Sequence, residues 1–273
     1  MEQKQSAVRL FVPDLPETTD AMIAGGVYAM IAETPPARFP VLASSLGGCF
    51  AEQRSATLLV PSDPKIFIDR LSAVGYPNAE TAIEKGRLQV FQLQDDFSKK
   101  MFRFGAEAFV SELDHFGLPA NSFLVIDQAD ELLSLHDMSL ALEQADELGK
   151  WARKLKITVL LVFTRVAAVA SSLATLTGLM DYLSGIVRLG GHQDGLDLTF
   201  EYWQSPDGTV AAKVYHLRIL DGGRYQVRKT EAPVSAEAVT AGAVPEDVEP
   251  DELAADLRYL YLAPQLADIG REM

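Results

Sequence analysis

The residue best suited to chemistry is Asp127, which ends the apolar run Phe123–Ile126. In nucleotide-binding sheets of the RecA type, a carboxylate at the end of such a strand holds magnesium directly or through water. Polar residues also end ordinary strands, so this position fits a magnesium ligand and a plain strand end alike. Asp127 is therefore a candidate magnesium residue, and the phosphate-binding loop decides between the two interpretations.

The loop expected to bind phosphates is Glu33–Pro40, which follows the first predicted strand. A phosphate loop needs glycines, whose backbone N–H groups wrap the phosphates, and a lysine that contacts the β and γ groups. This loop has neither, and it carries three prolines, which lack an N–H donor. Its Arg38 cannot replace a backbone cradle, and Gly25–Gly26 precede the strand and fit a turn. We therefore predict a degenerate phosphate loop without ATP hydrolysis.

A second pattern, Arg218 and Asp221, fits the R-x-x-D tetrapeptide by which some modules bind cyclic di-GMP. The arginine stacks on guanine or donates to it in a fork, and the aspartate accepts from the N–H edge of the base. The same residues also fit a strand arginine followed by a turn aspartate before Gly222–Gly223. Both interpretations stay open, and Arg218 and Asp221 are candidate ligand residues.

The remaining reactive side chains do not form a recognisable site. The single cysteine, Cys49, lies in a predicted apolar helix, where free cysteines are mostly inert core residues. It allows no internal disulfide and cannot hold zinc alone. The four histidines show no metal-ligand spacing. We therefore predict no metal site and no enzyme activity.

The composition limits the possible partners. The chain has 273 residues, of which 48% are hydrophobic, and a net charge of −14. This hydrophobic fraction is typical of a globular protein, and the acidic charge disfavours nucleic acid as a partner. No apolar run approaches the roughly 20 residues that span a bilayer. We expect a cytoplasmic protein that reaches a membrane only through partners.

The elements that would position these residues follow a clear order. Most of the first five predicted strands are continuous apolar runs rather than alternating ones, which is typical of parallel strands buried on both faces by crossover helices. These strands are predicted at 27–31, 56–60, 88–93, 122–126 and 157–163. Helices are predicted at 39–53, 63–74 with Ser62 as the N-cap, 105–116, 138–155 and 166–183. After residue 184, strands at 185–189, 196–203, 209–220 and 224–228 are joined by Gly/Asp turns, which predicts an antiparallel meander.

The predicted architecture is an α/β, RecA-like three-layer domain with a mainly parallel sheet extended by antiparallel hairpins. We divide the chain into an N-terminal extension (1–20), a RecA/KaiC-like pseudo-NTPase domain (21–229), an acidic linker (230–250) and a C-terminal helical segment (251–273). Residues 230–257 carry eight acidic residues and no lysine or arginine. This composition is typical of a solvated linker, and a following domain could begin at the helical segment.

Several segments resemble the N-terminal region of the BcsE family, regulatory proteins of bacterial cellulose synthesis. They are Ala24–Tyr28, Phe123–Ile126, Trp151–Lys154, Thr158–Val162 and Phe200–Trp203. The resemblance covers about residues 20–230. It implies a degenerate RecA-type NTPase that serves as an assembly platform at the inner membrane, with a BcsF-like small membrane protein and the BcsR–BcsQ complex as partners.

By the same resemblance, cyclic di-GMP binding belongs to C-terminal receiver-like and diguanylate-cyclase-like domains. We see no such module in this sequence, so no cofactor is expected in this chain. A complete α/β core without chemistry and a tail with unburied apolar residues also favour a non-catalytic scaffold that forms a homodimer. Two alternatives remain: an active KaiC-like ATPase with Asp127 as the magnesium carboxylate, and a direct cyclic di-GMP receptor through Arg218 and Asp221.

Overall fold

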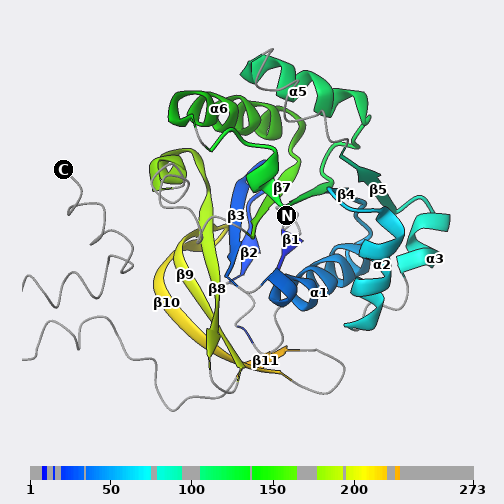
Figure 1. Ribbon diagram of the computed structural model, residues 1–273, viewed down its shortest axis with the longest axis vertical. Coiled ribbons are helices and arrows are strands. Elements are labelled where there is room, and N and C mark those ends of the chain that lie inside the picture. Colours follow the sequence, from blue (N-terminus) through cyan, green and yellow to red (C-terminus); the bar gives the residue numbers. More distant parts are fainter. Residues whose placement is uncertain are drawn as a thin grey trace, which may run out of the picture. The chain divides into compact units, whose positions relative to one another are not determined.

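A nine-stranded sheet runs through the part of the chain that the computed structural model describes (Figure 1). The described residues are 8–10, 15, 20–33, 35–74, 79–93, 105–135, 137–164, 177–192, 195–219 and 225–227. The strand order is β11-β10-β9-β8-β3-β7-β6-β4-β5. All pairings from β8 to β5 are parallel, and those from β8 to β11 are antiparallel. The predicted change from parallel to antiparallel pairing is therefore confirmed.

Five of the six parallel strands coincide with strands predicted from the sequence. They are β3 (Val27–Ala32), β4 (Ala56–Val60), β5 (Leu88–Gln92), β6 (Phe123–Asp127) and β7 (Thr158–Phe163). The sequence predicts the sixth, β8 (Gly185–His192), as the first strand of the antiparallel meander, but β8 pairs in parallel with β3 and antiparallel only with β9. Every residue of β3, β4, β6 and β7 is buried, because helices cover both faces of this part of the sheet. The antiparallel strands are β9 (Gly195–Ser205), β10 (Gly208–Ile219) and β11 (Tyr225–Val227). Buried and half-buried residues alternate along most of β9.

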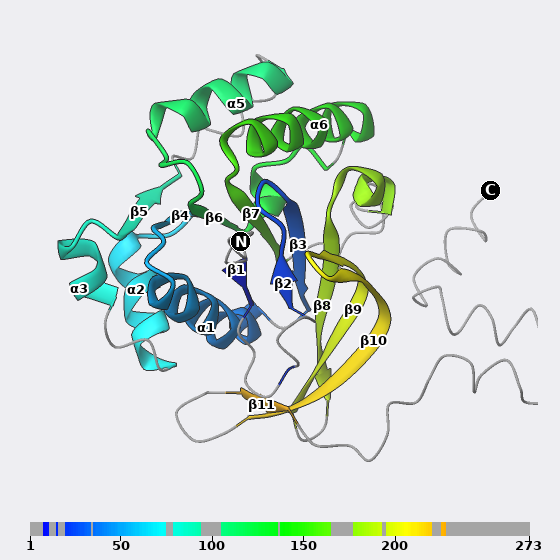
Figure 2. The same ribbon diagram turned by 180° about the vertical axis from the view of Figure 1, so that it is seen from behind.

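The helices form a layer on each face of the sheet, as Figures 1 and 2 show from opposite sides. One hydrophobic core contains side chains of α1 (Arg38–Ala51), α2 (Pro64–Ala73) and α3 (Ala79–Glu84). The other contains side chains of α5 (Ala106–His115) and α6 (Met138–Leu155). Short 3₁₀ turns occur at η1 (Pro35–Ala37), η2 (Ala129–Glu131) and η4 (Leu179–Tyr182). No helix of the described residues has the length and apolar character needed to cross a membrane.

Some sequence predictions need correction. Ser62 is not the N-cap of α2, because the helix begins at Pro64 and the Asp63 carboxylate accepts from the Lys65 N–H at 2.7 Å. Patterning also missed the short helix α3 and the separate two-stranded sheet of β1 (Val8–Arg9) and β2 (Ala21–Met22). These elements are too short to show a periodicity.

Other predictions fall on residues outside the described part. Only the end of the predicted helix 166–183 is described, and residues 179–182 of it form η4. The predicted linker and C-terminal helical segment, 230–273, lie wholly outside the described residues. They stay predictions, as does the division into domains.

An aromatic pair joins the antiparallel strands to the parallel part of the sheet. Trp203 on β9 is fully buried, packs 4.4 Å from the Tyr28 ring on β3 and donates to the Ala21 carbonyl at 2.9 Å. The Tyr28 hydroxyl donates to the Gln204 carbonyl at 2.6 Å, and burial raises its pKa. Gly185 on β8 lies opposite both residues in the sheet, and a Cβ there would come within 2.9 Å of both rings. The packing therefore requires a glycine at this position.

Candidate functional site

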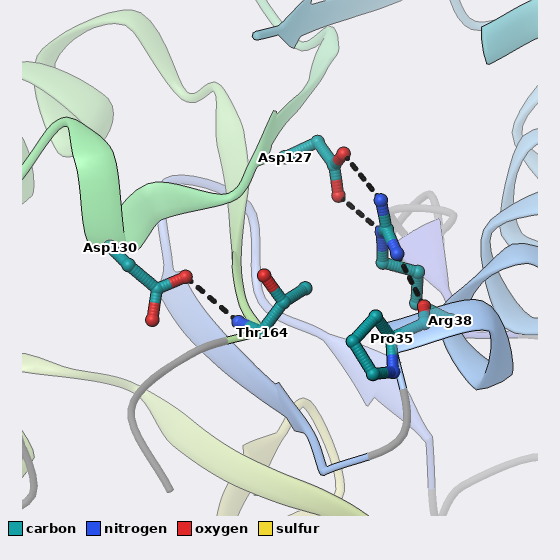
Figure 3. A network of polar contacts seen from close by, with 5 residues as sticks. All are labelled: Pro35, Arg38, Asp127, Asp130 and Thr164. Atoms are coloured by element: carbon teal, nitrogen blue, oxygen red, sulfur yellow. Dashed lines mark hydrogen bonds and ion pairs between the residues drawn. The ribbon is translucent and has the colours of Figure 1, made fainter. Parts of the chain in front are cut away.

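The structure brings Asp127 and Arg38 together at the carboxyl ends of the parallel strands (Figure 3). Asp127 is the last residue of β6, and Arg38 is the first residue of α1, the helix that follows β3. The Arg38 Nε donates to Asp127 Oδ1 at 2.6 Å, and its Nη2 donates to Oδ2 at 3.0 Å. The residues are only 3% and 1% exposed. They form a buried, bidentate ion pair between segments 89 residues apart.

Arg38 also holds its own loop in place. Its Nη1 donates to the Pro35 carbonyl in η1, and its guanidinium lies 4.4 Å from the centre of the Phe39 ring. The loop between β3 and α1 is thereby tied to the end of β6. A loop fixed in this way cannot move toward a ligand without breaking the ion pair.

The charges at this site depend on each other. Burial raises the pKa of Asp127, and the hydrogen bonds and positive charge of Arg38 oppose that effect. The backbone N–H of Gln128 also lowers the pKa, and the nearby charge of Asp130 raises it. Two parallel N–H···O bonds to a carboxylate are the strongest form of such a pair. Removing the guanidinium would leave a buried carboxylate without compensation, which is costly.

This arrangement does not fit a magnesium–phosphate group. Each Asp127 oxygen already accepts a hydrogen bond from Arg38, which fills the position of a cation beside the carboxylate. Pro35, Pro36 and Pro40 lack the N–H groups that a phosphate would need at the start of α1. Among the described residues, no group of three or more acidic, histidine or cysteine side chains could hold a metal ion.

The turn after Asp127 ties β6 to β7. Gln128 has left-handed backbone angles (φ 53°, ψ 51°), which turn the chain sharply into η2. The Asp130 Oδ2 then accepts from the backbone N–H of Thr164, directly after β7, at 2.8 Å (Figure 3). Sequence reasoning missed this contact because nothing in the local pattern indicates that β6 and β7 are neighbours.

The other candidate residues are not brought to this site. Arg218 is exposed on β10, opposite Gly195 on β9 and Gln226 on β11. Asp221 lies outside the described residues, so the R-x-x-D hypothesis stays untested. Sequence reasoning identified Arg38 as the single cation of the loop but missed its partner. The usable signal was an arginine at the start of a helix together with an aspartate at the end of a strand.

The single cysteine is buried, as predicted. Burial raises the pKa of the Cys49 thiol to about 12; to a smaller extent, the positive charge of Arg54 lowers this pKa and the negative charge of Glu52 raises it. Because the thiolate is the reactive form, such a thiol is almost entirely unreactive at neutral pH.

We expect an alkylating reagent to modify Cys49 of the folded protein at pH 8 roughly a thousandfold more slowly than an ordinary cysteine. The measurement is the rate of iodoacetamide labelling by mass spectrometry, with the urea-unfolded chain as the reference. Labelling of the folded protein at the same rate as the unfolded chain would show that the helix α1 opens readily, against the packing described.

Comparison with protein families gives a match over most of the chain. The family model described as cellulose biosynthesis protein BcsE, N-terminal domain, matches residues 5–224. This range includes Arg38 and Asp127 and covers more than half of the chain. No curated protein matches the chain significantly.

Proposed function

The chain belongs to the BcsE family, because the model of the N-terminal domain of that cellulose biosynthesis protein matches most of it, and we propose that the chain is a non-catalytic scaffold. Membership of the family implies a part in cellulose biosynthesis. The scaffold role goes beyond the family match, and the observation that supports it is the buried ion pair between Arg38 and Asp127.

The location of the ion pair supports the loss of catalysis. In open α/β sheets, ligands bind outside the carboxyl ends of the strands, where neighbouring connections leave the sheet in different directions. Here the connection from β3 passes β7 and β6 and leads to β4. The connection from the neighbouring strand β7 runs the other way, past β3, and leads to β8. The loop after β3 and the end of β6 are therefore where a nucleotide would be bound. This place is instead occupied by the Arg38 side chain, which donates two hydrogen bonds to Asp127, and by the prolines of the loop.

We further propose that the sheet is of the RecA type and that its phosphate loop is degenerate. A loop after a buried parallel strand, followed by a helix, and an aspartate at the end of another strand correspond to the phosphate loop and the magnesium carboxylate of such domains. The chain keeps this framework, with β3, α1 and β6 in these roles. It lacks the glycines and the lysine of the loop.

A scaffold acts through partners. We propose the partners that the family resemblance implies, a BcsF-like small membrane protein and the BcsR–BcsQ complex. The protein would then be cytoplasmic and reach the inner membrane through them. Cyclic di-GMP would act on this system through other domains rather than through the described residues of this chain.

We expect Mg·ATP to produce neither heat of binding in calorimetry nor a rise in Tm. A ligand at a hundredfold excess over its Kd would add about 2.7 kcal/mol to the free energy of unfolding, which a thermal scan detects easily. The same purified chain should retain the BcsR–BcsQ complex and the BcsF-like protein in a co-purification experiment.

The control for the nucleotide measurement is Asp127→Ala. Heat with the parent chain that disappears in this variant, while circular dichroism shows the variant to be folded, would establish a magnesium–nucleotide site and contradict the proposal. Failure of the chain to retain any of the named partners would contradict the scaffold role itself.

A further inference from the structure

Strand β5 forms one end of the sheet and pairs in parallel with β4 on one side only. Among the described residues, no strand pairs with its other side. Edge strands are usually protected against pairing by charged residues, prolines or bulges. The sequence of β5, Leu88-Gln-Val-Phe-Gln92, has no charge and no proline, and its register with β4 has no shift. Within the described residues, this edge therefore lacks the usual protection.

The backbone groups that face outward can be assigned. In a strand, the N–H and C=O of one residue point to the same side, and the side alternates along the chain. The Arg87 carbonyl accepts from the first residue of β4 at 2.8 Å, and the Leu93 N–H donates to the last residue of β4 at 2.8 Å. Leu88, Val90 and Gln92 therefore direct their N–H and C=O groups away from β4.

An open groove of about 610 Å³ lies beside this edge. Its lining includes Ile68 of α2, Ile83 of α3 and Val90 of β5. The Ile83 side chain is 42% exposed, which is unusual for an isoleucine beside a core. The helices α2 and α3 thus leave apolar surface uncovered at the end of the sheet.

Charge indicates what could cover it. The whole chain carries −14, so most encounters between two copies are repulsive. Residues 61–93, which contain α2, α3 and β5, carry four acidic and four basic residues and are therefore neutral. Since β5 itself is uncharged, a second copy can approach this edge without the repulsion that applies to the chain as a whole.

We propose that the β5 edge is the interface for a second copy of this chain, with β5 paired antiparallel to its counterpart about a two-fold axis at Val90. Such an isologous pairing joins Val90 to Val90 and Leu88 to Gln92, with about six backbone hydrogen bonds. Both copies then contribute to one continuous sheet, with α3 and its Ile83 on the same face in each. The inference deepens the scaffold proposal, on which it rests, by locating the surface of self-association.

The test is the oligomeric state of the full chain by sedimentation velocity between about 1 and 100 µM. Val90→Pro removes the central outward N–H and leaves the bonds to β4 intact, because proline is tolerated on an edge strand at such a position. We expect the dimer Kd to rise at least about tenfold in this variant and in Ile83→Glu. The matched control, Val214→Glu, changes a 49% exposed valine on β10 and should leave the dimer unchanged.

Circular dichroism and Tm show which variants fold, and Ile83→Glu decides the outcome if Val90→Pro does not. A parent chain that is monomeric at 100 µM would overturn the proposal, as would a dimer that neither variant weakens. Neither outcome depends on nucleotide or on partner proteins. A failure here therefore differs from a failure of the proposed function, which would appear as Mg·ATP binding or as lack of partner retention.

Discussion

Replacing Arg38 with methionine is expected to lower the free energy of unfolding by about 3–5 kcal/mol. The substitution keeps much of the side-chain volume but leaves the buried Asp127 carboxylate without its two hydrogen bonds. The measurement is urea denaturation at pH 7, followed by fluorescence or circular dichroism. Since Arg38 also fixes the loop at Pro35, the m-value shows whether the native state loosens as well.

The matched control is the double variant Arg38→Met/Asp127→Leu. Replacing both members of a buried ion pair with apolar residues of similar volume is often neutral, so we expect most of the lost stability to return. A single variant as stable as the parent chain would show that the ion pair is not formed in solution. A double variant as unstable as the single one would instead assign the loss to packing.

The pH dependence of the same variant follows from the pKa of Asp127. Burial raises this pKa, and without Arg38 only the backbone N–H of Gln128 still opposes that effect. A carboxyl group with a raised pKa binds its proton more tightly in the folded state than in the unfolded chain. The loss of folding stability caused by this buried carboxylate is therefore largest above its folded-state pKa. The loss disappears as the pH falls toward the pKa of an aspartate in the unfolded chain, about 3.9. The stability deficit of Arg38→Met should shrink between pH 7 and 5, and a constant deficit would contradict this cause.

Replacing Trp203 with alanine is the second large effect, with an expected loss of about 3–5 kcal/mol. The side chain is fully buried between β9 and β3, contacts the Tyr28 and Phe200 rings, and donates to the Ala21 carbonyl. The truncation leaves a cavity at the junction of the parallel and antiparallel strands. Thermal and urea denaturation of the whole chain measure the loss.

Trp203→Phe is the control, because it keeps an aromatic ring and removes the indole N–H. We expect it to cost about 1–2 kcal/mol, from the lost hydrogen bond and the smaller volume. A loss below about 1 kcal/mol in Trp203→Ala would contradict the close packing described. It would mean that the stability of the parallel part of the sheet does not depend on the antiparallel strands.

Local patterns in the sequence predict where most helices and strands lie and which of them are buried. Continuous apolar runs such as Thr158–Phe163 predicted strands covered on both faces, and these strands are fully buried. The apolar periodicity of residues 138–155 predicted α6 with both of its bounds. The three prolines of the loop after β3 and its lack of glycine and lysine are likewise read from the sequence alone. These features are local, because burial and backbone propensity are expressed in neighbouring residues.

Which distant residues contact each other depends on the tertiary structure. The sheet places β7 between β3 and β6, an order that no local pattern encodes. Only this order brings Arg38 to Asp127, 89 residues away, and so gives the buried carboxylate its ion-pair partner. The outward direction of the backbone at Val90 likewise depends on the register of β5 with β4. The spacing of apolar residues indicates whether a residue is buried. Which distant residue it contacts depends on the strand order, and the crossover connections set that order.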